Sequence, residues 1–88
     1  MLVLFNSEKG GAMGNPQAVR YEKVVELCPD PRGEGQIYLY ATLDNGKKVH
    51  LCSEGSMDRI VEKMIKIEEF YKKGYSFIDL RGVINSQG

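Results

Sequence analysis

The hydrophobic and polar positions between residues 37 and 53 alternate with a period of two, which is typical of β-strands. Two alternating runs, Ile37 to Leu43 and Lys48 to Ser53, flank Asp44-Asn45-Gly46, a strong hairpin signal. A two-residue loop would mix polar and aliphatic side chains on each face. A three-residue loop with Gly46 left-handed gathers the aliphatic side chains on one face. It pairs Leu43 with Lys47, Ala41 with Val49, Leu39 with Leu51 and Tyr40 with His50.

The segment from Val19 to Leu27 also alternates and predicts a further strand, although Tyr21, Val24, Val25 and Cys28 fit a helical period nearly as well. Treating Pro29 to Gly35 as a loop and pairing Cys28 with Gln36 aligns aliphatic residues again. Leu27 then faces Ile37 and Val25 faces Leu39. We therefore expect a three-stranded antiparallel meander.

A helix follows the meander. Ser56 can cap it, and Gly74 can end it. The apolar residues within this segment share one face at 100° per residue: Met57, Ile60, Val61, Met64, Ile65, Ile67 and Tyr71. Phe70 lies off this stripe and could contact the last strand, a partner chain or water.

The two ends of the chain predict shorter elements. Leu2 to Phe5 is typical of a short apolar strand, and Asn15-Pro16 suits the start of a brief helical turn. After Gly74 a final strand is expected, followed by a frayed tail from Asn85 to Gly88. One face of this strand carries Ser76, Ile78, Leu80 and Ile84. The predicted fold is α+β: an antiparallel β-meander with one amphipathic helix packed on one face and a C-terminal strand.

Length and charge narrow the class of function. Residues 1–88 suffice for a single small domain with one thin core, which leaves little room for a deep active site. Twelve basic residues balance twelve acidic ones, and this balance disfavours binding to nucleic acid through phosphates. The run Met1 to Phe5 is too short for a signal peptide or a membrane span, so a cytoplasmic location is expected. Cys28 and Cys52 are read as reduced thiols.

The second face of the predicted meander has an aromatic centre with charges of both signs around it. Its rows are Val24–Tyr40–His50 and Glu26–Tyr38–Cys52. Such a composition is expected of a protein contact patch, including a homodimer face. A solvated sheet face with cross-strand tyrosine pairs is the alternative. The predicted binding residues are Val24, Tyr38, Tyr40 and His50.

Candidate chemistry elsewhere in the chain is sparse. Cys28, His50 and Cys52 could ligate a metal, but two strands separate the cysteines by roughly 9–10 Å. His50 and Cys52 lack an obvious orienting carboxylate for nucleophilic catalysis other than Glu26. The Gly10 to Gly14 loop could offer N–H groups to an anion, yet it lacks the ending of a phosphate-binding loop. We therefore expect no enzyme, cofactor or metal site, and we expect Asp79 and Arg81 to form a surface ion pair.

The order of residues from Asn15 to Lys66 resembles small bacterial flagellar-operon proteins of the FlbD type. The resemblance is carried by Asn15 with Ala18 before Tyr21, Val24-Val25-Glu26, Pro29-Asp30, Ile37 to Leu43, Asn45-Gly46-Lys47-Lys48-Val49, and Ser56 to Lys63. The chain departs from that pattern in the insertion Arg32 to Gly35 and in the strand after Gly74. The resemblance implies a non-enzymatic accessory or regulatory role through protein contacts, without catalytic residues to carry over. A fainter similarity, to the LytTR-type DNA-binding domain, covers Tyr21 to Glu26 and the Asn-Gly-Lys hairpin.

The sequence thus predicts a cytoplasmic protein-interaction or regulatory module that binds a protein partner or itself, as a homodimer or higher oligomer. No membrane contact is expected. The competing hypothesis is a small nucleic-acid-binding domain that uses Lys47, Lys48 and Arg20 beside Tyr38 and Tyr40.

Overall fold

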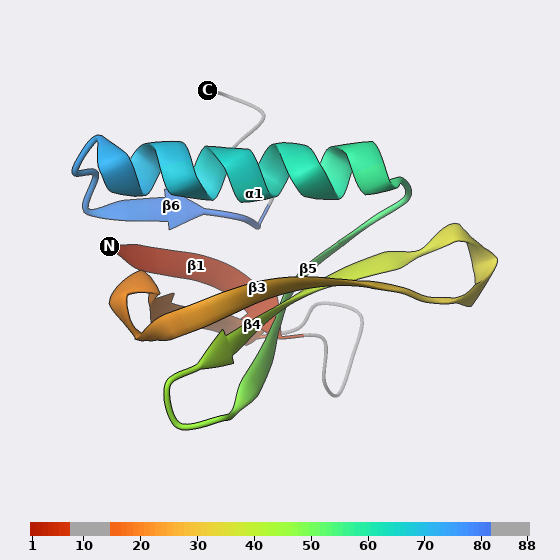
Figure 1. Cartoon of the computed structure of the whole chain (residues 1–88), viewed down its shortest axis with the longest axis horizontal. Helices are drawn as coiled ribbons and strands as arrows, with labels where there is room; N and C mark the ends of the chain where they lie inside the picture. Colours follow the sequence, from red (N-terminus) through yellow and green to blue (C-terminus); the bar gives the residue numbers. More distant parts are fainter. Residues whose placement is uncertain (8–14, 82–88) are drawn as a thin grey trace.

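A computed structural model of the chain describes residues 1–7 and 15–81. Strands, two short 3-10 turns and one long helix follow one another along this part of the chain (Figure 1). Their bounds are β1 (Leu2–Ser7), β2 (Asn15–Arg20), η1 (Tyr21–Lys23), β3 (Val24–Pro31), η2 (Gly33–Gly35), β4 (Ile37–Leu43), β5 (Lys48–Glu54), α1 (Met57–Lys72) and β6 (Phe77–Asp79).

The strands form two three-stranded sheets. The sheet β3-β4-β5 is antiparallel throughout, whereas the sheet β2-β1-β6 is mixed because β6 runs parallel to β1. The helix lies along β6 and above the strands (Figure 1). The predicted α+β fold, with a meander, one packed helix and a C-terminal strand, is confirmed.

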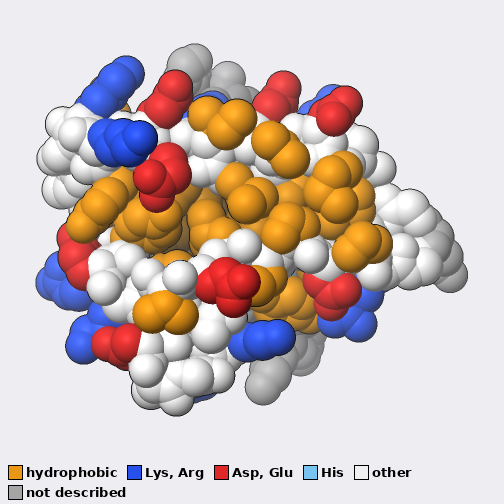
Figure 2. Space-filling model, viewed as in Figure 1, with side chains coloured by type: hydrophobic (Ala, Val, Ile, Leu, Met, Phe, Trp, Pro, Cys, Tyr) orange, Lys and Arg blue, Asp and Glu red, His pale blue; other side chains and the backbone are white. Residues whose placement is uncertain are grey.

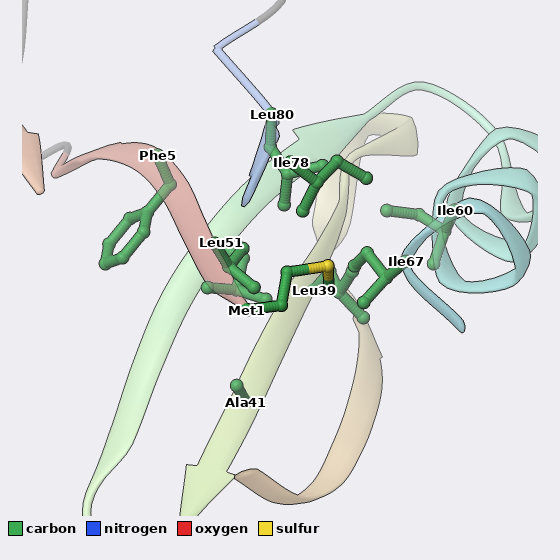
Figure 3. Close-up of a cluster of buried hydrophobic side chains, with 10 residues drawn as sticks. Met1, Phe5, Leu39, Ala41, Leu51, Ile60, Ile67, Ile78 and Leu80 are labelled. Carbon is green, nitrogen blue, oxygen red and sulfur yellow. The ribbon is translucent and has the colours of Figure 1, made fainter. Parts of the chain in front are cut away.

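One hydrophobic core joins both sheets to the helix. Leu39 and Ala41 of β4 and Ile60 and Ile67 of α1 are fully buried. Figure 3 shows the two isoleucines pointing from the helix toward the side chains of the strands. The N-terminal strand and the C-terminal segment add Val3, Phe5, Ile78 and Leu80. The predicted packing of the helix on the aliphatic face of the meander is therefore confirmed.

The predicted register between β3 and β4 is wrong by four residues. Cys28 lies opposite Tyr40 instead of Gln36, and Leu27 lies opposite Ala41 instead of Ile37. The strand continues through Pro29 and Pro31, which the prediction assigned to the loop. Two prolines two residues apart direct their nitrogens to the same side, so an edge strand can hold both on its unpaired side. The connection is thereby shortened to the residues around η2.

The hairpin of β4 and β5 is predicted correctly near the turn. Tyr40 lies opposite His50, Ala41 lies opposite Val49, and the backbone N–H of Leu43 donates to Lys47 across a three-residue loop. The register then shifts between Leu39 and Tyr40, so Leu39 faces Cys52 and not the predicted Leu51. A β-bulge at Leu51 explains the difference, because one extra residue on β5 changes the pairing beyond it.

The predicted continuous strand from Val19 to Leu27 is also wrong. The turn η1 divides it between the two sheets, and Tyr21 N–H donates to the carbonyl of Met1 at 2.8 Å. A second bulge lies between Val24 and Glu26. It leaves Val25, which was expected opposite Leu39 on the aliphatic face, 65% exposed.

The ends of the chain correct two further expectations. Asn15 and Pro16 begin a strand, not a helical turn, because β2 pairs with β1 along its whole length. The last strand is shorter than predicted and pairs with β1, with Ile78 opposite Val3. The Gly10 to Gly14 loop, Ile84 and the tail lie outside the described residues.

The helix has the predicted limits. Ser56 Oγ accepts a hydrogen bond from the Arg59 N–H at 3.3 Å, and Gly74 adopts a φ of 80° just beyond the last turn. Phe70 packs on Tyr75 with ring centroids 4.5 Å apart, so it contacts the segment that leads into β6. Within residues 1–7 and 15–81, no helix is long and apolar enough to cross a membrane.

Two polar contacts join the helix to the rest of the fold. Tyr21 Oη donates to Glu68, and the Tyr21 ring meets the edge of the Tyr71 ring at 4.9 Å. Burial and the adjacent Glu68 carboxylate raise the pKa of Tyr21 above its ordinary value. At the other end, Lys63 and Glu54 form an ion pair at 3.2 Å.

The turn of the β4–β5 hairpin provides a direct test of backbone conformation. Gly46 has a φ of 86°, and a Cβ built there meets no atom within 4 Å. Gly46→Ala should therefore destabilise the protein by about 1 kcal/mol through backbone strain alone. Urea unfolding would measure this loss. Unchanged or increased stability would show that the turn is not left-handed in solution.

Candidate interaction surface

Three aromatic rings lie together on the face of the β3-β4-β5 sheet that points away from the helix. Tyr38 and Tyr40 alternate along β4 with the buried Leu39 and Ala41, so they project from the opposite face. The ring of His50 stacks on Tyr38 with centroids 4.3 Å apart and planes at 19°, and it lies 5.3 Å from Tyr40. All three side chains are half-buried. The sequence prediction that these residues meet is confirmed.

Hydrogen bonds fix the imidazole of His50. Its Nε2 atom lies 3.1 Å from the carbonyl oxygen of Cys52 and 3.0 Å from Ser53 Oγ. A carbonyl only accepts, so the Nε2–H donates in this arrangement. The ring is thus held parallel to Tyr38 by its own strand.

Arg32, which the sequence analysis did not single out, covers the tyrosines. Its guanidinium carbon lies 4.9 Å from the Tyr38 ring centre, and Nη2 donates to Tyr40 Oη at 2.7 Å. Asp30 pairs with the same guanidinium at 3.2 Å. These contacts are cation–π and charge-assisted interactions that order a long side chain at the surface. We call Arg32, Tyr38, Tyr40 and His50 the aromatic cluster.

The rows of this face differ from the predicted ones because of the changes in register. They are Glu26–Thr42–Lys48, Cys28–Tyr40–His50 and Asp30–Tyr38–Ser53. Cys52 was expected on this face, but the bulge at Leu51 turns it toward the core and places Ser53 opposite Tyr38. Acidic side chains therefore line the β3 edge, and Lys48 lies on the β5 edge.

Val24 is the predicted binding residue that the structure does not bring to the cluster. It lies opposite Leu43 and packs against the core. The bulge after it places its side chain on the opposite face of the sheet from that of Glu26. Its predicted row with Tyr40 and His50 is wrong. Cys28 occupies that place in the row.

The residues predicted for nucleic-acid contact are dispersed. Arg20 lies on β2 in the other sheet, and Lys47 lies in the turn between β4 and β5. Only Lys48 of the three borders the rows of the cluster. No continuous basic stripe joins these three residues.

The candidate metal and catalytic groups are also separated. Cys28 and His50 occupy opposite ends of one row with Tyr40 between them, and Cys52 packs toward the core. The described part of the chain holds no group of three His, Cys, Asp or Glu residues placed to bind a metal ion. Cys28 and Cys52 are not joined by a disulfide.

Asp79 and Arg81 form the predicted ion pair, but only the Arg81 side chain reaches the surface, with 31% of it exposed. Asp79 is only 4% exposed, and both of its oxygens accept hydrogen bonds from the Arg81 guanidinium, at 3.0 and 2.8 Å. The Arg81 guanidinium holds the pKa of the Asp79 carboxyl below its ordinary value. We interpret this buried carboxylate and its arginine partner as a structural pair that stabilises the packing of β6.

A second apolar surface lies along α1. Val61 is 42% exposed and Ile65 is 53% exposed, and together with Met64 they line a shallow groove. Figure 2 shows hydrophobic side chains gathered in a band along the helix and the strands beside it. The predicted apolar stripe is thus only partly buried, since the core takes Ile60 and Ile67.

Comparison of the chain with protein-family models, with curated proteins and with solved structures found no match. The resemblance to the FlbD type rests on the sequence pattern alone. The function is therefore argued from the surface itself.

Proposed function

We propose that this chain is a non-enzymatic, cytoplasmic protein-interaction module that associates with itself through the aromatic cluster. The observation that carries the proposal is the packing of Tyr38, Tyr40 and His50 against one another beneath Arg32, with His50 stacked on Tyr38. Tyrosine and arginine are enriched among the residues that contribute most binding energy at protein interfaces.

The cluster is ordered before any partner binds. Tyr38 is held by His50, and Tyr40 is held by the hydrogen bond from Arg32. Association then costs less side-chain entropy than it does for side chains that must be immobilised at the interface. Residues of the same type without these contacts would make a weaker binding surface.

The small size of the face argues for a weak contact. The face is only three strands wide, with the strands about 4.8 Å apart. Its area is therefore smaller than the roughly 800 Å² that each partner buries in a standard interface. We therefore expect micromolar self-association. This range suits a regulatory contact that forms and dissociates with concentration.

The geometry around the candidate nucleophiles supports the non-enzymatic part of the proposal. Nε2 of His50 is engaged by Cys52 O and Ser53 Oγ, and Tyr40 separates the imidazole from Cys28. A thiol needs a base within hydrogen-bonding distance to be activated in this way. The resemblance to the FlbD type agrees with an accessory or regulatory role.

A nucleic-acid-binding function is the alternative. Arg32 lies over Tyr38 and Tyr40, and Lys48 lines the same shallow hollow as Tyr40, a combination that could stack a base and contact a phosphate. However, Arg32 already covers Tyr38, and Glu26 and Asp30 place negative charge along the adjacent edge. Strong, salt-dependent retention of single-stranded oligonucleotides in a filter-binding assay would favour this alternative.

Tyr40→Glu tests self-association. Glutamate removes the tyrosine ring from the centre of the face and puts there a charge that an interface must desolvate, even with Arg32 beside it, so the variant should be monomeric at concentrations where the unmodified chain associates. Dissociation constants that differ at least about 100-fold are expected from sedimentation equilibrium, since losing a central aromatic contact costs about 3 kcal/mol. Circular dichroism would confirm that the half-buried position tolerates the change.

Ile65→Glu is the matched control on the apolar surface of the helix. It introduces the same charge at a side chain that is 53% exposed and that lies on the helix, not on the sheet face of the aromatic cluster. Association should persist in this variant. If Ile65→Glu abolishes association and Tyr40→Glu does not, the helix mediates it and the proposal is wrong.

A further inference from the structure

The face of the aromatic cluster carries opposite charges on its two edges. Glu26 on β3 and Lys48 on β5 end the same row, with Thr42 between them, and both side chains are exposed. Two strand spacings, about 10 Å, separate their positions. Charges so far apart at the surface are available to another chain.

Two copies can place this face against itself in two ways. A two-fold axis that runs along β4 puts β3 of one copy over β5 of the other. Glu26 then meets Lys48 of the second copy, and Cys28 meets His50 of the second copy. Each contact occurs twice, and Tyr40 lies at the axis.

The other arrangement has its two-fold axis across the strands at Tyr40. It puts β3 over β3 and reverses the order of the rows. Glu26 then meets Asp30 of the second copy, while Lys48 meets Ser53. Asp30 is already paired with Arg32, so Glu26 meets that ion pair, and neither copy's Lys48 has a carboxylate opposite it. This arrangement therefore lacks the two opposite-charge contacts of the first one.

We propose that the aromatic cluster binds a second copy of this chain about a two-fold axis parallel to β4, with reciprocal Glu26–Lys48 contacts across the interface. This inference rests on the proposed function, and it adds the orientation of the partner and the residues that specify it. Face-to-face sheets pack about 10 Å apart, a distance that the side chains of glutamate and lysine span together.

The test uses two single variants and their mixture. Glu26→Lys puts two lysines at each contact of its own dimer, and Lys48→Glu puts two glutamates there. Each variant alone should associate at least about tenfold more weakly than the unmodified chain, because two like-charge contacts replace two ion pairs. In a mixed dimer both contacts are again Lys–Glu, so the mixture should associate as strongly as the unmodified chain.

A matched pair on the helix controls for net charge. Glu62→Lys and Lys66→Glu alter exposed residues of α1 by the same charges. Each should self-associate like the unmodified chain. Their mixture should show no more than a weak preference for mixed dimers, of the size that long-range attraction produces.

Cys28 gives an independent readout of the same orientation. Its thiol should react more slowly with iodoacetamide as protein concentration rises, because His50 of the second copy covers it. Mass spectrometry of the peptides separates its modification from that of Cys52, which packs toward the core. In Tyr40→Glu the rate at Cys28 should not depend on concentration.

The outcomes separate this inference from the proposed function. If Tyr40→Glu abolishes association but neither single charge variant weakens it, the cluster binds itself in another orientation and this inference is wrong. If the mixture associates no better than the single variants, the reciprocal contact is likewise excluded. A monomeric unmodified chain at high micromolar concentration would overturn both proposals.

Discussion

Ile67→Ala is expected to remove about 4 kcal/mol from the free energy of unfolding. Ile67 is fully buried in the core that joins α1 to both sheets (Figure 3). The loss is the sum of two free-energy contributions: the burial of the methyl and methylene groups that is no longer gained, and the cost of the cavity that they leave. A domain of this size has a total stability of about 5–10 kcal/mol, so the effect is large.

Ile65→Ala is the matched control for that measurement. The two isoleucines lie two residues apart on the same helix, but Ile65 is 53% exposed and Ile67 is not exposed. Urea unfolding should show a loss at Ile65 below about 1 kcal/mol. Equal losses at the two positions would show that the helix packs on the sheets with a different face.

Arg81→Met should cost about 3 kcal/mol at neutral pH. Asp79 is buried, and the variant removes the guanidinium that binds both of its oxygens, leaving the backbone N–H of Arg81 as a donor at 2.9 Å. A buried carboxylate that has lost its counter-ion destabilises the folded state. The double variant Asp79→Asn with Arg81→Met removes the charge as well and should recover part of the loss.

The dependence on pH identifies the ion pair as the cause. The folded-state pKa of Asp79 lies below the ordinary aspartate value of about 3.9, so the pair stabilises the fold above that pH. This stability is lost as the pH falls through the folded-state value. In Arg81→Met, burial raises the pKa of Asp79 instead, so acidification relieves the penalty. The difference in the free energy of unfolding between the unmodified chain and Arg81→Met should therefore be largest near pH 7 and should shrink toward pH 3. A difference that is independent of pH would contradict this account.

The β4–β5 hairpin could be predicted because its determinants are local. The Asn45-Gly46 turn specifies a short loop, and the alternating aliphatic side chains exclude the other loop length. The pairing of Tyr40 with His50, and with it most of the aromatic cluster, follows from these two features.

The register of β3 could not be obtained in the same way. Slipping the pairing by four residues keeps every side chain on its own face, so the hydrophobic pattern fits the predicted and the observed register equally. The informative signal was the spacing of Pro29 and Pro31, which an edge strand accepts. Following the strand through both prolines would have placed Asp30 beside Tyr38 and brought Arg32 near the tyrosines.

The two β-bulges decided which other residues join the face. Each bulge adds one residue to one strand. Beyond the bulge, side chains point to the opposite face of the sheet from the one that regular alternation predicts. Val24 and Cys52 were consequently assigned to the wrong face, and Ser53 was missed. Nothing in the local sequence marks Leu51 or Val25 as the extra residue.

The second sheet depends on contacts between distant parts of the chain. β1 pairs in parallel with β6, which begins more than seventy residues later, with Leu2 opposite Phe77. Short apolar runs do not specify their partners, since strand pairing at long range is set by the packing of the whole core. The strand at Asn15–Arg20 pairs with the preceding strand β1, and it was missed because Asn15-Pro16 also suits the start of a helical turn.

Two-dimensional ¹H–¹⁵N NMR spectra across a concentration series test the central claim most directly. Between about 10 µM and 1 mM, we expect progressive shifts of amides on β3, β4 and β5 around Tyr38, Tyr40 and His50. Amides of the helix near Val61 and Ile65 should stay unchanged. Shifts confined to the helix, or spectra that do not change with concentration, would contradict self-association through the aromatic cluster.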